Sequence, residues 1–251
     1  MNTDITTTVL DRFQEAGRVA RFWLRDDDAI EPTPALDRLL ELTEAHDVPL
    51  ALAVIPELTG EALAERLTRA RHVSVTVHGW RHANHALEMS KKRELGADRP
   101  ADVVLGELSA GFTKLADLHG DRFQPVLVPP WNRIDPGLLP RLSGLGFRAF
   151  SVYGPEKPAV LPMINTHIDV MDWHGTRGCR DRDALWREIV ARLTVCLESG
   201  GSIGLLTHHL VHDEAVWAFL GDLFDATTAH PGCRWVGLAE LVEEMAVDQK
   251  R

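Results

Sequence analysis

Short apolar runs alternate with longer amphipathic segments along most of the chain. The short runs have the length and composition of buried β-strands. They predict strands at residues 21–25, 49–54, 73–77, 125–128, 147–151, 163–168, 202–207 and 234–236. The longer segments repeat their apolar residues at three- and four-residue intervals, as helices that pack on one face do. They predict helices at residues 34–46, 101–118, 183–198, 213–228 and 238–246.

This alternation of strand and helix predicts an α/β protein in which helices cover a parallel sheet. Residues that could carry chemistry follow several of the strands: Asp26–Asp28, His78, Pro129–Trp131, Asp169 and His208. In a closed or nearly closed barrel, the carboxyl ends of the strands meet at one rim, where active sites are built. Distant strands of an open sheet could not bring these residues together. We therefore predict a TIM-barrel-like (β/α) barrel.

Length and composition narrow the choice of partners. The 251 residues contain no linker tract and no internal repeat, which predicts a single domain over residues 1–251. The net charge of -10 argues against nucleic acid and anionic membranes, because both need a basic face. Three scattered cysteines suggest free thiols. Residues 1–20 lack the apolar stretch of a signal peptide, and no run could span a bilayer, so we expect a cytoplasmic protein.

Two histidines four residues apart, His78 and His82, follow the strand-like run 73–77. Two neutral imidazoles and one carboxylate form a ligand set for Zn²⁺ or a related ion, with one coordination position left open for water. The chain has 12 histidines, so this spacing could also arise by chance on a surface loop. The pair becomes informative if a carboxylate joins it.

Three consecutive carboxylates, Asp26, Asp27 and Asp28, follow the apolar run 22–24. Such charges repel one another unless water or a cation stabilises them, and Arg25 could neutralise part of the charge. A solvated turn that caps a helix is the alternative interpretation. In an extended strand, Asp26 and Asp28 would share one side and Asp27 the other. A bend at the strand end could still aim neighbouring carboxylates into one pocket.

The strand predicted at 125–128 is followed by Pro129, Pro130 and Trp131. Two prolines fix a rigid, extended turn. The indole of Trp131 offers a flat apolar wall that suits the face of a sugar ring. A strand exit beside a core Trp is the simpler alternative, and the segment gains weight only together with the others.

Two later runs end in residues that could move or orient protons. His208 and His209 follow the run 203–207, and histidine exchanges protons near neutral pH. Asp169, in the segment that continues to Asp172 and Trp173, could hold a histidine in its working tautomer. Each of these residues could equally be structural.

Together and in this order, the segments resemble the polysaccharide deacetylase superfamily, also called the NodB-homology or carbohydrate esterase 4 group. The family pattern has an Asp-Asp pair, a His-x-x-x-His pair, an Arg-x-Pro-aromatic turn, an Asp-rich Trp segment and a Leu-x-His. The corresponding positions here are Asp27-Asp28, His78–His82, Val128–Trp131, Asp169–Trp173 and Leu206–His208. The match covers about residues 20–210.

The resemblance implies a deformed (β/α)₇ barrel in which one Asp and two His hold one divalent metal ion. Asp28, His78 and His82 would be the ligands, of Zn²⁺ first and of Co²⁺, Ni²⁺ or Fe²⁺ as alternatives. Asp27 would be the general base. Asp26 could displace either aspartate by one position.

The remaining roles that the resemblance implies concern the reaction itself. His208, oriented by Asp169, would protonate the departing amine, with His209 as its substitute. The metal and a backbone N–H near Trp131, next to Pro130, would stabilise the oxyanion.

Two positions depart from the family pattern. Val128 stands where the family has an Arg that supports the catalytic aspartate, so Arg25 or Arg133 would have to replace it. Gly79 stands where the family usually has Ser or Thr, so a hydrogen bond that steadies the loop is missing.

The resemblance thus predicts a metal-dependent hydrolase that cleaves a linear amide C–N bond, and first of all an N-deacetylase of an acetylated amino sugar or glycoconjugate. Two alternatives stay open. One is a cyclic-amide or other C–N hydrolase on the same barrel. The other is a barrel that has lost catalysis and binds carbohydrate.

Overall fold

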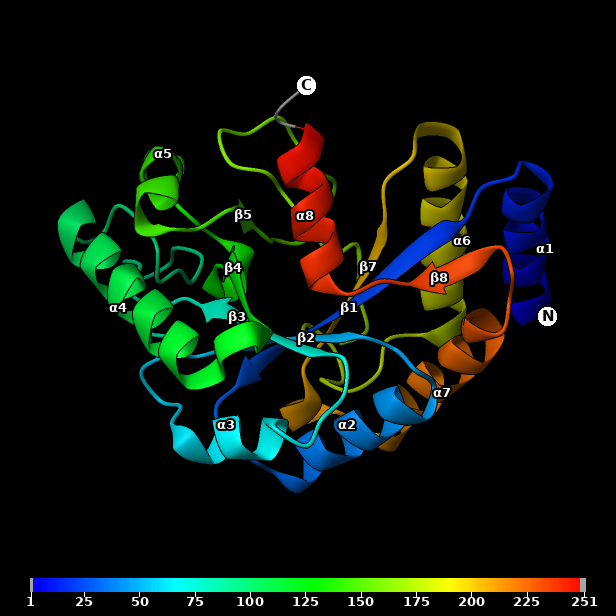
Figure 1. The fold of residues 1–251 in the computed structure, drawn as a ribbon, viewed down its shortest axis with the longest axis horizontal. Helices are drawn as coiled ribbons and strands as arrows, with labels where there is room; N and C mark the ends of the chain where they lie inside the picture. The colour runs from blue at the N-terminus through cyan, green and yellow to red at the C-terminus, as the bar shows by residue number, and fades with distance from the viewer. Residues whose placement is uncertain (1, 249–251) are drawn as a thin grey trace.

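A curled parallel sheet forms the centre of the molecule in the computed structural model, which describes residues 2–248 (Figure 1). The strands are β1 (Ala20–Ala29), β2 (Leu50–Val54), β3 (Val73–His78), β4 (Phe123–Val128), β5 (Ala149–Phe150), β6 (Ile168–Asp169), β7 (Ile203–Thr207) and β8 (Cys233–Trp235). They follow the order β5-β4-β3-β2-β1-β7-β6, and β8 pairs with the start of β1. The predicted deformed (β/α)₇ barrel is confirmed, with β8 as a short additional strand.

Helices cover both sides of this sheet, and they do so unequally. The α-helices are α1 (Asn2–Glu15), α2 (Pro34–Ala45), α3 (Glu61–Leu67), α4 (Ala101–His119), α5 (Leu139–Leu142), α6 (Arg182–Ser199), α7 (Glu214–Thr228) and α8 (Leu238–Asp248). Figure 1 shows α2, α3, α4, α6 and α7 around the convex side, whereas α8 lies on the concave side. Within residues 2–248, no helix combines the length and the apolar character that crossing a membrane requires.

Strand β1 separates two apolar cores. Phe22 and Leu24 belong to the large core beneath the outer helices. Trp23, between them, belongs to a smaller cluster with Leu241 and Val242 of α8. Because side chains alternate along a strand, Arg25 is the next residue on the face of Trp23. The concave face of β1 therefore changes from apolar to charged as the strand approaches the rim.

The chain between β5 and β6 is less regular than the sequence predicts. Of the strand expected at 163–168, only the end belongs to β6, while Met163 and Thr166 form isolated bridges to the segment that contains β5. Pro162 precedes this stretch, and a proline cannot donate a hydrogen bond to a neighbouring strand. Isolated bridges therefore fix the segment between β5 and β6 to the sheet.

Candidate metal centre and active site

The three consecutive aspartates have three different sets of partners, and Asp26 faces β7. It is fully buried. Its Oδ2 accepts hydrogen bonds from the hydroxyl of Thr207 at 2.7 Å and from the backbone N–H of His209 at 2.8 Å, and its Oδ1 contacts Nδ1 of His209. Burial alone would raise the pKa of Asp26, but the charge and hydrogen bond of His209 outweigh burial and lower it. Asp26 and His209 thus form a buried pair that anchors the chain on both sides of His208.

Asp27 is held by the residue that precedes it by two positions. Arg25 donates from Nε to Oδ1 at 2.8 Å and from Nη2 to Oδ2 at 3.0 Å. The same guanidinium donates to the hydroxyl of Ser151 at 2.6 Å and to the side-chain oxygen of Asn132 at 3.0 Å. Arg25 is fully buried and Asp27 is 2% exposed. A fork of this kind fixes the carboxylate in one orientation.

Arg25 therefore takes the role of the family arginine that is replaced by Val128 in this chain. The structure places Arg25 on Asp27, whereas Arg133 donates to the backbone carbonyl of Lys92 at 2.9 Å. Neither Ser151 nor Asn132 stood out in the sequence. Asn132 follows Trp131 directly, but nothing local indicated that it would reach Arg25 across the barrel.

Asp28 turns toward the two histidines because β1 is irregular at this point. Asp28 has a left-handed φ of 71°, and the pairing of β1 with β2 shifts register between Asp26 and Ala29. A shift of this kind re-aims side chains at the end of a strand. The simple alternation expected from the sequence ends here, and the anticipated bend takes its place.

The ligand atoms of Asp28, His78 and His82 all lie within 4.8 Å of one another. Nε2 of His78 lies 3.1 Å from Oδ1 of Asp28, and Nε2 of His82 lies 3.4 Å from the same oxygen. His78 ends β3 and is 2% exposed, whereas His82 lies on the following loop with a left-handed φ of 57°. The cluster thus joins the end of β1, the end of β3 and the loop after β3.

This arrangement fits a divalent cation. Nδ1 of His78 lies 2.9 Å from the carbonyl oxygen of Val128, so Nδ1 donates to this carbonyl and Nε2 is the ring nitrogen directed at Asp28. Nε2 lies 3.1 Å from Oδ1 of Asp28. Burial alone would lower the pKa of His78, but the charges of Asp27 and Asp28 raise it. A metal ion bound here would replace the proton on Nε2, because a histidine ligand has to be neutral. A histidine whose second nitrogen binds a backbone carbonyl is also typical of metal ligation. Two imidazoles and one carboxylate suit Zn²⁺, Co²⁺, Ni²⁺ or Fe²⁺.

The electrostatics of this cluster favour an ionised Asp28 and a neutral His82. Burial alone would raise the pKa of Asp28, but the hydrogen bond and charge of His78 and the charge of His82 hold it well below its usual range. Burial and the nearby charge of His78 lower the pKa of His82. His82 is thus neutral at physiological pH, as a metal ligand must be.

Trp131 lies beside the metal-binding candidates. Its ring centroid is 4.3 Å from that of His82. Trp131 and Asn132 both have left-handed φ values, 55° and 56°, and such strain in residues other than glycine persists only where the surroundings impose it. Pro130, the first residue of this turn, is buried. The turn holds an aromatic wall next to the histidine pair.

Asp169 and His208 meet through Trp173. Asp169 ends β6, and its carboxylate accepts from the indole N–H of Trp173 at 2.8 Å and from the backbone N–H of Met171 at 3.0 Å. The Trp173 ring packs edge-on against the His208 ring, with centroids 4.7 Å apart. Within residues 2–248, Nδ1 of His208 is buried without a hydrogen-bond partner. The contact between Asp169 and His208 expected from the sequence is therefore indirect.

The pKa shifts indicate that Asp169 and His208 interact electrostatically with the aspartates of β1. Burial and the charge of Asp27 raise the pKa of Asp169, although the charge of His208 opposes this. The charge of His208 also lowers the pKa of Asp28. Ionisable groups from β1, β6 and the chain after β7 are thus close enough to influence one another, which is common at functional sites.

Comparison with solved structures identifies the architecture. A protein from Mycobacterium smegmatis assigned as a polysaccharide deacetylase superposes with a TM-score of 0.70 at 16% identity, over 93% of this chain and 92% of that one. The peptidoglycan deacetylase PdaC from Bacillus subtilis superposes with a TM-score of 0.56 at 15% identity, over 92% and 94% of the two chains. This chain has the polysaccharide deacetylase fold. No family model and no curated protein matches the sequence itself.

The polysaccharide deacetylase fold is also found in an esterase that contains a metal ion. A family 4 acetyl xylan esterase from Clostridium thermocellum, solved with a cobalt ion, superposes with a TM-score of 0.54 at 16% identity, over 89% of this chain and 91% of that one. Identities this low establish the shared fold, and the chemistry of the present chain has to be argued from its own residues.

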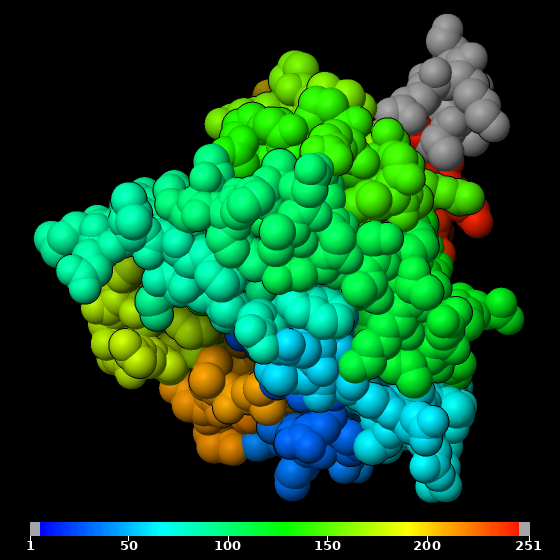
Figure 2. All heavy atoms as spheres, turned by 90° about the vertical axis from the view of Figure 1, so that its left-hand side faces the viewer, coloured from blue at the N-terminus to red at the C-terminus, as the bar shows by residue number. Residues whose placement is uncertain are grey.

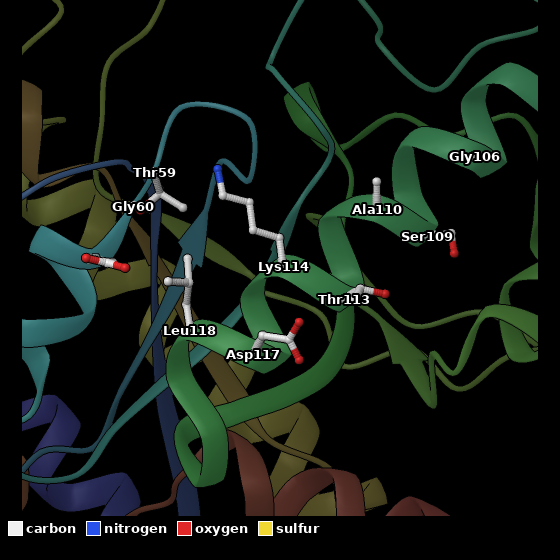
Figure 3. Close-up of a pocket in the computed structure, with 10 residues that line it drawn as sticks. Thr59, Gly60, Gly106, Ser109, Ala110, Thr113, Lys114, Asp117 and Leu118 are labelled. Carbon is white, nitrogen blue, oxygen red and sulfur yellow. The ribbon is translucent and has the colours of Figure 1, made fainter.

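A hollow elsewhere on this deacetylase fold is not part of the site. It has a volume of about 810 Å³ and lies between α3 and α4 on the outer helical layer (Figure 3). Its lining includes Ser109, Thr113 and Lys114 of α4. No residue of the candidate site lines it, and among the described residues its lining contains no histidine or cysteine. The ionisable residues of the candidate site lie at the carboxyl ends of the strands instead.

Proposed function

We propose that the protein is a metal-dependent hydrolase that removes an acetyl group from the nitrogen of an amino sugar or glycoconjugate. The observation that carries the proposal is the combination of a candidate ligand set and an oriented carboxylate on adjacent residues of β1. Asp28 faces His78 and His82, and its neighbour Asp27 is fixed by Arg25. A ligand set beside an oriented carboxylate is what hydrolysis with an activated water requires.

The metal ion that we expect is Zn²⁺, and Co²⁺, Ni²⁺ and Fe²⁺ suit the same donors. Asp28, His78 and His82 would hold it. Such an ion polarises a carbonyl group and lowers the pKa of a bound water. Asp27 and His208 would supply the proton transfers, and the turn at Trp131 would orient the substrate.

In the proposed reaction, Asp27 accepts a proton from the attacking water, because Arg25 holds its carboxylate in one orientation next to Asp28. The water oxygen forms a bond to the acetyl carbonyl carbon, and the backbone N–H near Trp131 stabilises the negative charge on the carbonyl oxygen. His208 then donates a proton to the nitrogen as the C–N bond breaks. The products are acetate and a free amine.

His208 favours an amide over an ester as substrate. The esterase neighbour shows that acetyl esters are cleaved on this fold. An alkoxide is a better leaving group than an amide anion, and an amine leaves only when its nitrogen is protonated, so an amide hydrolase depends more strongly on a positioned acid. His208 is held against Trp173 with a buried ring nitrogen free of partners in the described part of the chain. We therefore place N-deacetylation before ester hydrolysis.

Metal analysis and product analysis together test the proposal. Elemental analysis of the purified protein should give about one divalent ion per chain, and His82→Ala should lose it while His72→Ala, at an exposed histidine, keeps it. Acetate release from N-acetylated amino-sugar oligomers, acetylated xylan and cyclic amides should be greatest with the first. Wild-type protein that binds no metal and releases no acetate would refute the proposal.

Asp27→Asn separates catalysis from metal binding. The substitution leaves Asp28, His78 and His82 intact, so the ion should stay bound. Turnover should fall by about 10²–10⁴-fold, because an amide cannot accept the proton. Normal turnover in Asp27→Asn would show that another group is the base.

A further inference from the structure

Glu94 is a buried carboxylate that forms hydrogen bonds to the backbone of the loop that carries His82. Its side chain is fully buried. Oε2 accepts the backbone N–H of Trp80 at 3.1 Å, and Oε1 accepts those of Arg81 at 2.9 Å and Ala83 at 3.3 Å. These three N–H groups lie on both sides of His82. One carboxylate thus binds the backbone that carries the second histidine of the cluster.

The loop is shaped around this carboxylate. Gly79 and His82 both have left-handed φ values, 60° and 57°, and the chain between them turns its N–H groups inward. Several backbone N–H groups that converge on one point form an anion-binding nest. Burial of a carboxylate is costly unless hydrogen bonds satisfy it, and here the backbone supplies them. The negative charge of Glu94 and the fold of the loop therefore depend on each other.

Gly79 is matched to Glu94. A Cβ atom on Gly79 would lie 2.0 Å from Oε2 of Glu94 and 2.6 Å from Cγ of Pro130. The space that a side chain at position 79 would fill is occupied by the carboxylate. The hydrogen bond that appeared to be missing when Gly79 was compared with the family pattern is thus replaced by three bonds from another part of the chain.

Glu94 is itself anchored by its neighbour. Leu95 is fully buried and pairs with Ile134 in an isolated parallel bridge, and its carbonyl accepts the N–H of Asp135 at 2.7 Å. The segment before Glu94 projects from the surface, where Figure 2 shows it in teal. His85 N–H donates to the carbonyl of Arg93 at 3.0 Å and closes the base of this projection. Glu94 lies at the fixed base and not at the tip.

We propose that Glu94 is the positioning residue that holds His82 in its metal-binding conformation. The inference rests on the proposed metal centre and adds a residue that the sequence did not indicate. A left-handed His82 is unfavourable by itself, and Glu94 stabilises it through the N–H groups on either side. Without Glu94 the loop relaxes, and the ion must reorganise it on binding, which weakens affinity.

Calorimetric titration of the metal-free protein with Zn²⁺ tests this role. Glu94→Gln and Glu94→Ala should each weaken affinity, by about 10- to 100-fold for loss of a group that orients a ligand. Glu57→Gln is the matched control. Glu57 forms an ion pair with the side chain of Arg81 on the same loop but leaves the N–H groups bound by Glu94 untouched. Its affinity should stay within about twofold of wild type, since exposed ion pairs contribute little.

Amide hydrogen exchange of the metal-free proteins provides the second readout. Glu94→Gln, the milder change, should speed exchange at Trp80, Arg81 and Ala83 while the strands keep their protection. Unchanged exchange at these three amides, or Zn²⁺ affinity equal to wild type, overturns the role of Glu94. If wild-type protein binds no Zn²⁺, the proposed metal centre fails, and with it the effect on metal binding. The exchange measurement then still decides whether Glu94 holds the loop.

Discussion

Arg25 and Asp27 lie two residues apart on one strand, and the guanidinium of the first holds the carboxylate of the second through hydrogen bonds of 2.8 and 3.0 Å. Residues at this spacing share one face of a strand. The orientation of the proposed base is therefore built into β1 and does not depend on a side chain from β4. This is how the chain accommodates Val128.

Arg25→Lys should reduce turnover while leaving metal binding intact. Lysine keeps the charge but lacks the planar fork, so one charge-assisted hydrogen bond to Asp27 is lost. Such a bond contributes about 1.5–3 kcal/mol, which corresponds to roughly a 10- to 100-fold fall in kcat. Steady-state kinetics with elemental analysis measure both effects. Arg133→Lys is the control, and an equal loss in both variants would contradict the assignment of Arg25.

His208→Ala should distinguish substrates by their leaving groups. Hydrolysis of an acetylated amine should fall by about 10²–10⁴-fold, because the nitrogen departs only when protonated. Hydrolysis of p-nitrophenyl acetate should change much less, since nitrophenolate leaves without a proton. The ratio of the two rates in wild type and variant is the measurement. Equal losses on both substrates would mean that His208 serves another purpose.

Asp26→Asn should destabilise the fold more than a similar change at the surface. It leaves His209 buried without its counter-charge, and breaking a buried pair costs about 3–5 kcal/mol. Asp225 also pairs with a histidine, His46, but Asp225 is 75% exposed, so Asp225→Asn should cost about 0–1 kcal/mol. Urea unfolding of the two variants gives the comparison. Similar losses would show that the Asp26–His209 pair is not a stabilising contact.

His119 should make the protein less stable in acid. It is 7% exposed at the end of α4, and burial together with the charge of Arg122 lowers its pKa from 6.5 to about 4. The unfolded chain then binds more protons than the folded one between these values, so stability falls as pH drops through this window. Allowing for partial screening by solvent, the loss is about 1–2 kcal/mol. Urea unfolding at pH 7 and pH 5 should show a smaller drop for His119→Gln than for wild type.

The central strands were easier to predict than the N-terminal helix α1. Predicted strands 49–54 and 73–77 coincide with β2 and β3 to within one residue, because buried parallel strands are continuous apolar runs. Helix α1 was missed, since its polar composition and its run of β-branched Thr6, Thr7 and Thr8 give no helical signal. It forms because Leu10 and Phe13 are buried in the core. Tertiary contacts of this kind have no local signature.

The candidate site shows the same limit. The order and spacing of the aspartates and histidines could be read from the sequence, because these residues end strands. The supporting residues could not. Ser151 reaches Arg25 from the chain after β5, and Asn132 reaches it from the turn after β4. Glu94 reaches the loop of His82 from a segment without regular structure. Their roles depend on which parts of the chain meet in space.

Helix α8 places apolar side chains next to the strand that carries the candidate site. Leu241 and Val242 share a cluster with Trp23, which lies directly beneath Arg25 on the concave face of β1. The ion pair of Arg25 and Asp27 is thus buried next to an apolar cluster, where attraction between charges is stronger than at the surface. A polar residue in place of Leu241 or Val242, far from any reacting atom, would hydrate this apolar cluster. It would thereby weaken the ion pair with which Arg25 orients Asp27.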